Sequence, residues 1–265
     1  MRHSSAWPMI LILLAGGEVL GQDTTSARFS SSLPEELQFS DGIGLDGEEE
    51  ALAKTLAEGD PTDRLAAARA LWRGQSRRHA TEVLMLLAGP PPGGEAFRSF
   101  QREVEATLQP QGILRELKQG QYQWGAWLAF VRPHKDLFPP LLEALKDKPN
   151  SHAETLLALG NSGDPRALKP LLDRLKSKDH WIPGEAAQAL GYLGNPEAEP
   201  KLIEALAADN GYLQVKACRA LATMGSSRAL PVLERLAKDD RYTGALSIQG
   251  MAKYAIERTR KREKR

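Results

Sequence analysis

Cysteine is nearly absent from this 265-residue sequence, which contains one such residue, Cys218. A single cysteine cannot form an internal disulfide, and the sequence has no CxxC motif or Cys/His cluster of the kind that binds zinc. Unpaired cysteines are among the most frequently buried residues. We therefore expect Cys218 to be a small apolar side chain in the core and not a reactive thiol.

The sequence also lacks an excess of charge of either sign. Lys and Arg total 35 and Asp and Glu total 34, which gives a formal net charge of +1. Proteins dedicated to nucleic acid normally carry a basic face or a high isoelectric point, so we expect no nucleic-acid partner. Aromatic residues make up only 6% of the chain, and its abundant alanine and leucine suit closely packed helices.

The apolar run near the N-terminus is too short to cross a bilayer, which needs about 20 apolar residues. This run, Trp7–Ala15, follows a weakly basic start at Arg2 and His3. A basic start and a short apolar run are typical of a secretory signal peptide, here residues 1–21 with cleavage near Gly21. We expect export to a periplasmic or extracellular location without a transmembrane anchor. The alternative is an uncleaved apolar N-terminus.

Residues 22–49 are rich first in small hydroxyl residues and then in acidic residues and glycine. This composition buries too little apolar surface to offset the entropy lost on ordering. We expect a disordered spacer, and an acidic interaction segment is the alternative.

A repeat of about 31 residues dominates the C-terminal half of the chain. Three segments align, the third being one residue shorter after Ala229: Ala158–Leu175 (ALGNSGDPRALKPLLDRL), Ala189–Leu206 (ALGYLGNPEAEPKLIEAL) and Ala220–Leu236 (ALATMGSSRALPVLERL). A fixed period between 20 and 50 residues indicates a solenoid or a related array.

Each repeat has the pattern of two helices joined by a tight turn. The first helix ends at a glycine that suits a left-handed conformation, and the second begins at a polar residue that can cap it. The three turns are Gly163-Asp164-Pro165, Gly194-Asn195-Pro196 and Gly225-Ser226-Ser227. Proline suits the first helical position, where a backbone N–H has no partner. Because neither helix can bury its apolar face alone, successive pairs must stack.

Weaker copies of the pair extend upstream. They are Arg64–Leu87, with Ser76 as the expected cap, Glu95–Leu117, and Tyr122–Lys146. Residues Gly244–Arg258 are predicted to form a closing helix. The fold class is therefore all-α: an α-solenoid of about five helical pairs and a terminal helix over residues 50–259.

A basic tail is expected at residues 260–265, after the solenoid. Its cations can complement the dipole of the last helix and keep the terminal repeat soluble. Contact with an anionic surface is the alternative.

The pattern A-x-x-A-L-G-x-x-G-D-P-x-A-x-x-x-L-x-x-x-L resembles the PBS-lyase HEAT-like repeat family, strongly over residues 152–240 and weakly over 50–148. The resemblance implies a fold that serves mostly as a scaffold. Deoxyhypusine hydroxylase, which resembles this fold, binds di-iron through His-Glu dipeptides, but none of the five histidines here precedes a glutamate. Bilin lyases attach a chromophore to a partner protein, so a bilin-lyase-like enzyme or enzyme subunit is the alternative function.

The sequence contains no recognisable catalytic or cofactor motif. His134, His152 and His180 are not spaced as metal ligands on one helix. A phosphate-binding glycine-rich loop and a GxSxG motif are both missing. We therefore expect no catalytic site, no metal and no cofactor.

Three aromatic residues, Trp181, Tyr212 and Tyr242, follow the turns between repeats at separations of 31 and 30 residues. Equal repeat positions align along one edge of a solenoid, so we expect the rings to form a ladder. Packing between repeats is one role. The other is a recognition strip, because Trp and Tyr are enriched at binding hot spots. The sequence thus predicts a non-catalytic scaffold that binds a protein partner whose identity it does not reveal.

Overall fold

The computed structural model describes residues 47–88, 94–119, 122–147, 153–238, 242–243 and 246–264. The expected signal peptide, most of the expected spacer and His152 lie outside these residues. The fold is all-α apart from two paired two-residue strands, β1 (Tyr242–Thr243) and β2 (Leu246–Ser247). Among the described helices, none is long and apolar enough to span a membrane. The chain divides into two compact units, residues 1–112 and 113–265.

Helix α3 is the centre of the first unit, because α2, α4 and α5 all pack against it. Its buried face includes Leu71 and Trp72, and the unit's core also takes in Val83 and Phe100. The Asp60 carboxylate caps α3 by accepting hydrogen bonds from the first backbone N–H groups. The helices are α2 (Gly47–Glu58), α3 (Pro61–Arg73), α4 (Ala80–Ala88), α5 (Glu95–Thr107) and α6 (Pro110–Lys118), the last of which crosses the division between units.

Two expectations for this unit differ from the structure. Helix α2 begins at Gly47, inside the expected spacer, and its acidic first turn complements the helix dipole. Ser76 does not cap α4, which begins only at Ala80. The Ser76 hydroxyl instead donates to the Glu49 carboxylate, so it joins α2 to the turn after α3.

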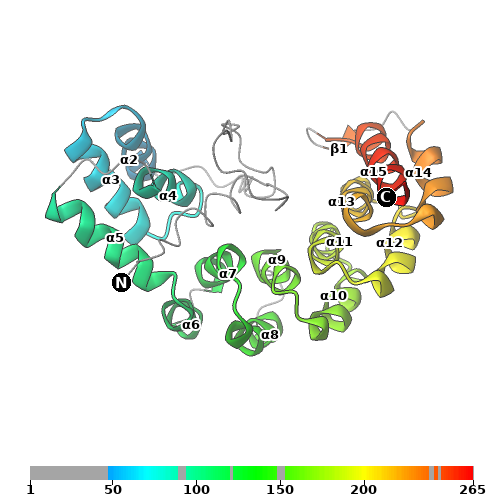
Figure 1. Ribbon diagram of the computed structural model, residues 1–265, viewed down its shortest axis with the longest axis horizontal. Coiled ribbons are helices and arrows are strands. Elements are labelled where there is room, and N and C mark those ends of the chain that lie inside the picture. Colours follow the sequence, from blue (N-terminus) through cyan, green and yellow to red (C-terminus); the bar gives the residue numbers. More distant parts are fainter. Residues whose placement is uncertain are drawn as a thin grey trace. The chain divides into compact units, whose positions relative to one another are not determined.

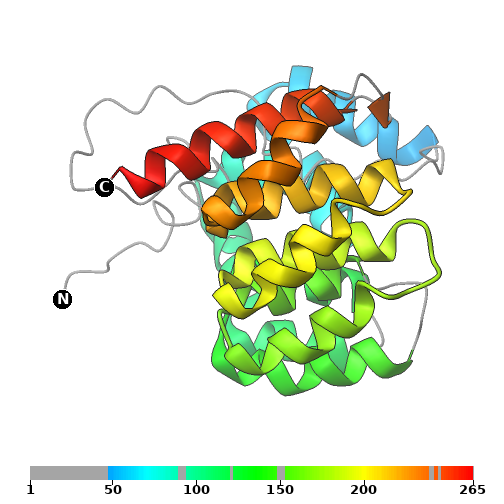
Figure 2. The same ribbon diagram turned by 90° about the vertical axis from the view of Figure 1, so that its right-hand side faces the viewer.

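In the second unit, helices alternate between two layers (Figure 1). The first helices of successive pairs, α7, α9, α11, α13 and α15, pack side by side in one layer, here named the A layer. The second helices, α8, α10, α12 and α14, form the B layer and each packs against the next A-layer helix. Figure 2 shows the pairs stacked one above another in chain order, with α15 at the end of the stack. This repeat architecture with a terminal helix confirms the predicted fold class.

The elements of the second unit after α6 are α7 (Tyr122–Val131), η2 (Lys135–Leu137), α8 (Phe138–Asp147), α9 (Ala153–Asn161), η3 (Pro165–Ala167), α10 (Leu168–Arg174), α11 (Ile182–Leu193), η4 (Pro196–Ala198), α12 (Glu199–Ala205), α13 (Gly211–Met224), η5 (Ser227–Ala229), α14 (Leu230–Leu236) and α15 (Ile248–Glu263).

Glycine at one repeat position lets the A-layer helices approach closely. A Cβ added at Gly160 would lie 2.2 Å from the carbonyl oxygen of Ala189, and one added at Gly191 would lie 2.7 Å from the Cα of Ala220. Backbone therefore packs on the next helix at both steps. Larger residues here would force adjacent repeats apart.

The turns at Gly163 and Gly194 have the predicted form. Both glycines are left-handed, with φ of +66° and +65°. The Asp164 and Asn195 side chains then accept a backbone hydrogen bond at 3.0 Å, from residues 166 and 197. Both caps are therefore confirmed, although the second helices begin with a short 3-10 turn, η3 or η4.

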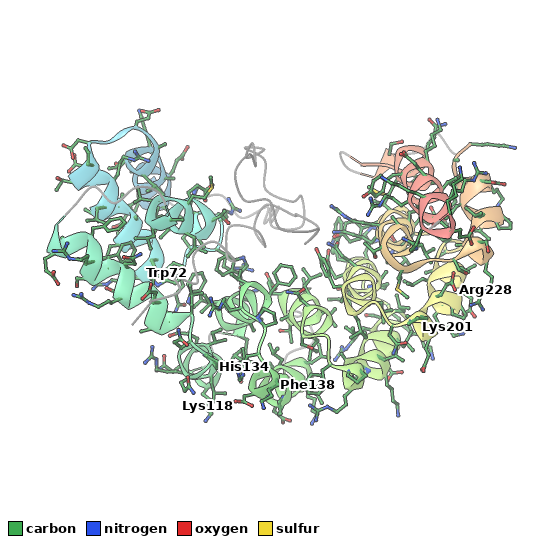
Figure 3. All side chains as sticks on the ribbon, viewed as in Figure 1. Trp72, Lys118, His134, Phe138, Lys201 and Arg228 are labelled. Atoms are coloured by element: carbon green, nitrogen blue, oxygen red, sulfur yellow. The ribbon has the colours of Figure 1, made fainter. Side chains whose placement is uncertain are left out.

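The expected left-handed conformation at Gly225 is wrong. This glycine has φ −67° and ψ 153°, which is extended backbone. Interactions from distant helices hold the turn that follows. The Glu199 carboxylate accepts from the Ser226 backbone N–H and hydroxyl, and the Glu263 carboxylate accepts from the backbone N–H of Ser227 at 2.7 Å. Arg228, labelled in Figure 3, pairs with Glu199 at 3.3 Å.

Helix α15 continues to Glu263, so residues 260–263 are helical and do not belong to a tail. Arg262 reaches the C-terminal end of another helix, α13. Its guanidinium donates to the backbone carbonyls of Leu221, Ala222, Thr223 and Gly225, at 2.5 to 3.3 Å. A cation at the C-terminal end of a helix satisfies free carbonyls and complements the helix dipole. The basic run therefore helps to fix the last pair.

Candidate partner-binding edge

Cys218 and His134, whose side chains the sequence raised as a possible reactive thiol and a possible metal ligand, both have structural roles. Cys218 is fully buried, and burial raises the pKa of its thiol to about 12. His134 caps η2 by accepting from the backbone N–H of Asp136, just before Phe138 (Figure 3). Within the described residues, no three His, Cys, Asp or Glu side chains are grouped as a metal site.

The loops that precede α11 and α13 are held by side chains at one repeat position. Asp179 accepts from the backbone N–H groups of Trp181 and Ile182, at 2.7 and 3.1 Å. Asn210, 31 residues later, accepts from the N–H of Leu213 at 3.0 Å. The Asn210 amide also donates to the carbonyl of His180 at 2.9 Å, so it links the two loops. This edge therefore presents its side chains from a hydrogen-bonded backbone.

Trp181 is the most exposed large hydrophobic side chain in the described part of the chain, at 58%. Its ring meets His180 edge to face, with centroids 5.0 Å apart and an interplanar angle of 86°. It meets Tyr212 of the next repeat in the same manner, at 4.8 Å and 79°. Such pairs fix ring orientation and contribute about 0.5–1.5 kcal/mol beyond burial. The indole is therefore oriented by two neighbours while more than half of it remains available.

A buried charged pair, Glu185 and Lys216, holds the side chain of Tyr212 in place. Its hydroxyl donates to the Glu185 carboxylate, and the Lys216 ammonium lies 3.6 Å from that carboxylate and 5.2 Å from the tyrosine ring. Burial, reinforced by the Glu185 charge, raises the pKa of Tyr212 well above its usual range. A Cβ at Gly184 would lie 2.4 Å from the ring, so a glycine is required where Tyr212 packs.

The same polar chain continues along α11. Lys216 donates to the side-chain carbonyl of Gln188 at 2.5 Å. The Gln188 amide donates to the hydroxyl of Tyr192 at 3.2 Å, and the Tyr192 ring contacts Phe130 of α7 edge to face, with centroids 5.4 Å apart. The sequence reasoning missed this chain. A glutamate and a lysine 31 residues apart, at one position of otherwise apolar A-layer helices, were the available indication.

An open groove of about 400 Å³ lies between the two loops beside Trp181. Its lining residues come from the ends of α10 and α12, from both loops and from the starts of α11 and α13: Leu175, Lys176, Ser177, Lys178, Asp179, His180, Pro183, Ala208, Asp209, Asn210 and Leu213. The groove adjoins the aromatic cluster through His180. Its lining combines polar and charged side chains with the apolar Leu175, Pro183 and Leu213.

Tyr242 does not occupy the same place as the other two aromatic residues. It lies in strand β1 and pairs with Ser247, and its side chain is outside the described residues. The loop before α15 is longer, and Ser247 caps α15 by accepting from the N–H of Gly250 at 3.1 Å. Counted from the capping residue, Gln249 and not Tyr242 is the equivalent of Tyr212. The expected ladder is therefore reduced to Trp181 and Tyr212 in contact.

Comparison with protein families adds one assignment. Residues 178–252 match the family model for HEAT repeats. The matched HEAT-like segment begins in the loop before α11 and contains both Trp181 and Tyr212. No curated protein matches the chain. The repeat pattern, the two-layer stack and this match agree that the second unit is an array of helical repeats.

Proposed function

We propose that this chain is a non-catalytic HEAT-repeat scaffold of an exported compartment, which binds a protein partner at the edge formed by His180, Trp181 and Tyr212. The finer assignment to PBS-lyase HEAT-like repeats is part of this proposal and is supported by the Gly-Asp-Pro and Gly-Asn-Pro turns. The exported location is supported by the apolar run at Trp7–Ala15 after a basic start.

The observation that carries the proposal is the 58% exposure of Trp181 in a fixed orientation. A tryptophan that served only to pack repeats would be covered by the next helix, whereas Tyr212 covers only part of this indole. Aromatic anchors are enriched at binding hot spots, where truncation costs about 2 kcal/mol or more. The groove between the loops gives such an anchor a concave neighbour that can accept side chains of a partner.

Rigidity beneath the ring further supports a binding role. Tyr212 is held by Glu185, and the loop backbone is held by Asp179 and Asn210. A surface that is already ordered loses little conformational entropy when a partner binds. The edge therefore has both the side chain and the preorganisation that a recognition site needs.

The test uses site-specific photo-crosslinking in the native cell envelope. A photoreactive phenylalanine analogue replaces Trp181 in one variant and Met85 in a control, because Met85 is also exposed, at 48%, but lies on α4. We expect one protein to be crosslinked at position 181 and not at position 85. Equal crosslinking at both positions, or none at 181, would contradict the proposal.

A second measurement separates binding from packing. Capture of the crosslinked partner by Trp181→Ala should fall at least about tenfold, while Met85→Ala should capture it normally. Circular dichroism of both variants should match the wild-type chain. Loss of helicity in Trp181→Ala would instead assign the ring to packing. Export is tested by N-terminal sequencing, which should begin near Gln22, and an intact Met1 in cytoplasmic protein would contradict it.

A further inference from the structure

The exposed side of α15 carries positive charge that the described structure leaves unneutralised. Helix α15 packs on α13 and α14. An open surface on its other side is lined by Lys253, Ile256, Glu257, Arg260, Lys261 and Lys264. Arg260 is paired with Glu234 at 2.6 Å, but Lys253, Lys261 and Lys264 have no ion pair within the described residues. Tyr254, 47% exposed, adds an apolar ring to this face.

The exposed side of α2 has the opposite character. This helix carries four glutamates and one lysine. Glu48, Glu50 and Glu58 are exposed, and none forms an ion pair within the described part of the chain. Two exposed alanines, Ala51 and Ala57, lie among these acidic residues. Their small side chains leave room for the side chains of an approaching helix.

We propose that the basic face of α15 binds the acidic face of α2 in a second copy of the chain, head to tail. Helix α15 takes the place of a first helix, yet within the described residues no following pair packs on it. Charge complementarity selects the occupant, because α2 has three more acidic than basic residues and α15 has three more basic than acidic.

The whole sequence has the same polarity. Residues 1–112 contain 10 Lys and Arg against 16 Asp and Glu, and residues 113–265 contain 25 against 18. A contact between the second unit of one copy and the first unit of another therefore joins opposite net charges. Such a contact joins two different surfaces, so it does not close on itself in a dimer and can add further copies.

The expected association is weak and depends on salt. The matching lysines and glutamates are exposed, and exposed ion pairs each contribute little. Raising salt from about 0.1 M to about 1 M shortens the Debye length from about 10 Å to about 3 Å, which removes most of the attraction. Sedimentation velocity of the purified chain should show a mass that rises with concentration at low salt and stays monomeric at high salt.

Charge reversal identifies the two faces. Lys261→Glu with Lys264→Glu on α15, or Glu48→Lys with Glu50→Lys on α2, should each weaken self-association at least about tenfold. Lys169→Glu with Lys238→Glu is the control, because both lysines are exposed elsewhere and the charge change is the same. We expect this control to self-associate like the wild-type chain. If it weakened self-association as much as the α15 variant does, overall charge and not the α15 face would be responsible, and the proposal would be overturned.

The decisive sample is an equimolar mixture of the α15-reversed and α2-reversed chains. Each is expected to be monomeric alone, and the mixture should associate because it restores opposite charges at both contacts. A monomeric wild-type chain at every concentration, or a mixture that fails to associate, would overturn the proposal. So would a monomeric chain that binds phosphatidylserine vesicles through Lys261 and Lys264, since the face would then serve a lipid surface.

Discussion

The second unit uses one turn in two different ways. After α9 and α11, a left-handed glycine and a local polar cap connect the helices of a pair, at Gly163-Asp164 and Gly194-Asn195. After α13, Gly225 is extended, and the turn depends on Glu199 of α12 and on Arg262 and Glu263 of α15. The first two turns are stabilised within a few residues, and the third is stabilised by neighbouring helices.

This difference shows that a repeat can keep its fold after its turn has lost the local sequence features that stabilise the other two turns. The third turn has Ser-Ser where the second has Asn-Pro, so it lacks the proline that fixes the first helical position. Ser226 caps weakly, since its hydroxyl lies 3.4 Å from the N–H of Arg228. Long-range charged groups supply the missing hydrogen bonds. The last pair therefore depends on α15, while the earlier pairs, which carry Trp181, do not.

The largest effect is expected from Arg262→Ala. The substitution leaves the last carbonyls of α13 without their charged donor, and we expect a loss of about 3 kcal/mol in the free energy of unfolding. Arg260→Ala is the control, because its pair with Glu234 is exposed and should contribute less than about 1 kcal/mol. Urea denaturation measures both. Equal losses would show that α15 does not hold the third turn through Arg262.

Glu199→Ala is expected to have the next largest effect, a loss of about 2 kcal/mol in the free energy of unfolding. Glu199 is only 3% exposed, and its removal leaves the partly buried N–H of Ser226 without its acceptor. Glu204→Ala on the same helix removes only an exposed pair with Lys201 and should change stability by a few tenths of a kcal/mol. If the two variants were equally stable, the turn would not need its contact with α12.

Substitutions at Gly194 and Gly225 test the difference between the two turns directly. Each is expected to change the free energy of unfolding by about 1 kcal/mol. Gly194→Ala places a Cβ in a left-handed residue and should be destabilising, whereas Gly194→Asn should be milder because asparagine tolerates that conformation. At Gly225 the obstacle is the carbonyl oxygen of Leu221, 2.7 Å from an added Cβ. Gly225→Asn should therefore be as destabilising as Gly225→Ala. Thermal unfolding of the four variants checks this, and relief at both sites would contradict the assigned backbone.

The smallest difference is expected between the caps. Asn195→Ala should cost about 1 kcal/mol as the loss of a normal N-cap. The local cap of Ser226 is longer, so Ser226→Thr, which keeps a hydroxyl, should be close to wild type, and Ser226→Ala should be dominated by the lost contact with Glu199. A double-mutant cycle of Ser226→Ala with Glu199→Ala measures that coupling. An additive cycle would contradict it.

The sequence predicted those parts of the molecule that local chemistry determines. The caps at Asp164 and Asn195 follow from patterns a few residues long, and the helical pairs follow from the repeat of about 31 residues. The burial of Cys218 follows from the general tendency of unpaired cysteines to be buried. The contact of Trp181 with Tyr212 followed from equal repeat positions. Tyr242 was misplaced because the loop before α15 is longer, which sequence spacing alone does not reveal.

The remaining features depend on contacts between residues far apart in the chain. Gly225 could not be distinguished from Gly194 without knowing that Arg262 donates to its carbonyl. The pair of Glu185 and Lys216, which supports Tyr212, is buried only after repeats stack. The solenoid was predicted to begin at residue 50, three residues after the start of α2 at Gly47, because the acidic first turn of this helix resembles the spacer before it.

Residue-resolved hydrogen exchange of the wild-type chain and Arg262→Ala is the most direct test of this account. We predict that amides at the third turn and at the end of α13 lose protection in the variant. Amides of the turns after Gly163 and Gly194, and those around Trp181, should keep theirs, because these repeats are stabilised locally. A uniform loss of protection across all three turns would contradict the account, since the repeats would then depend on α15 alike.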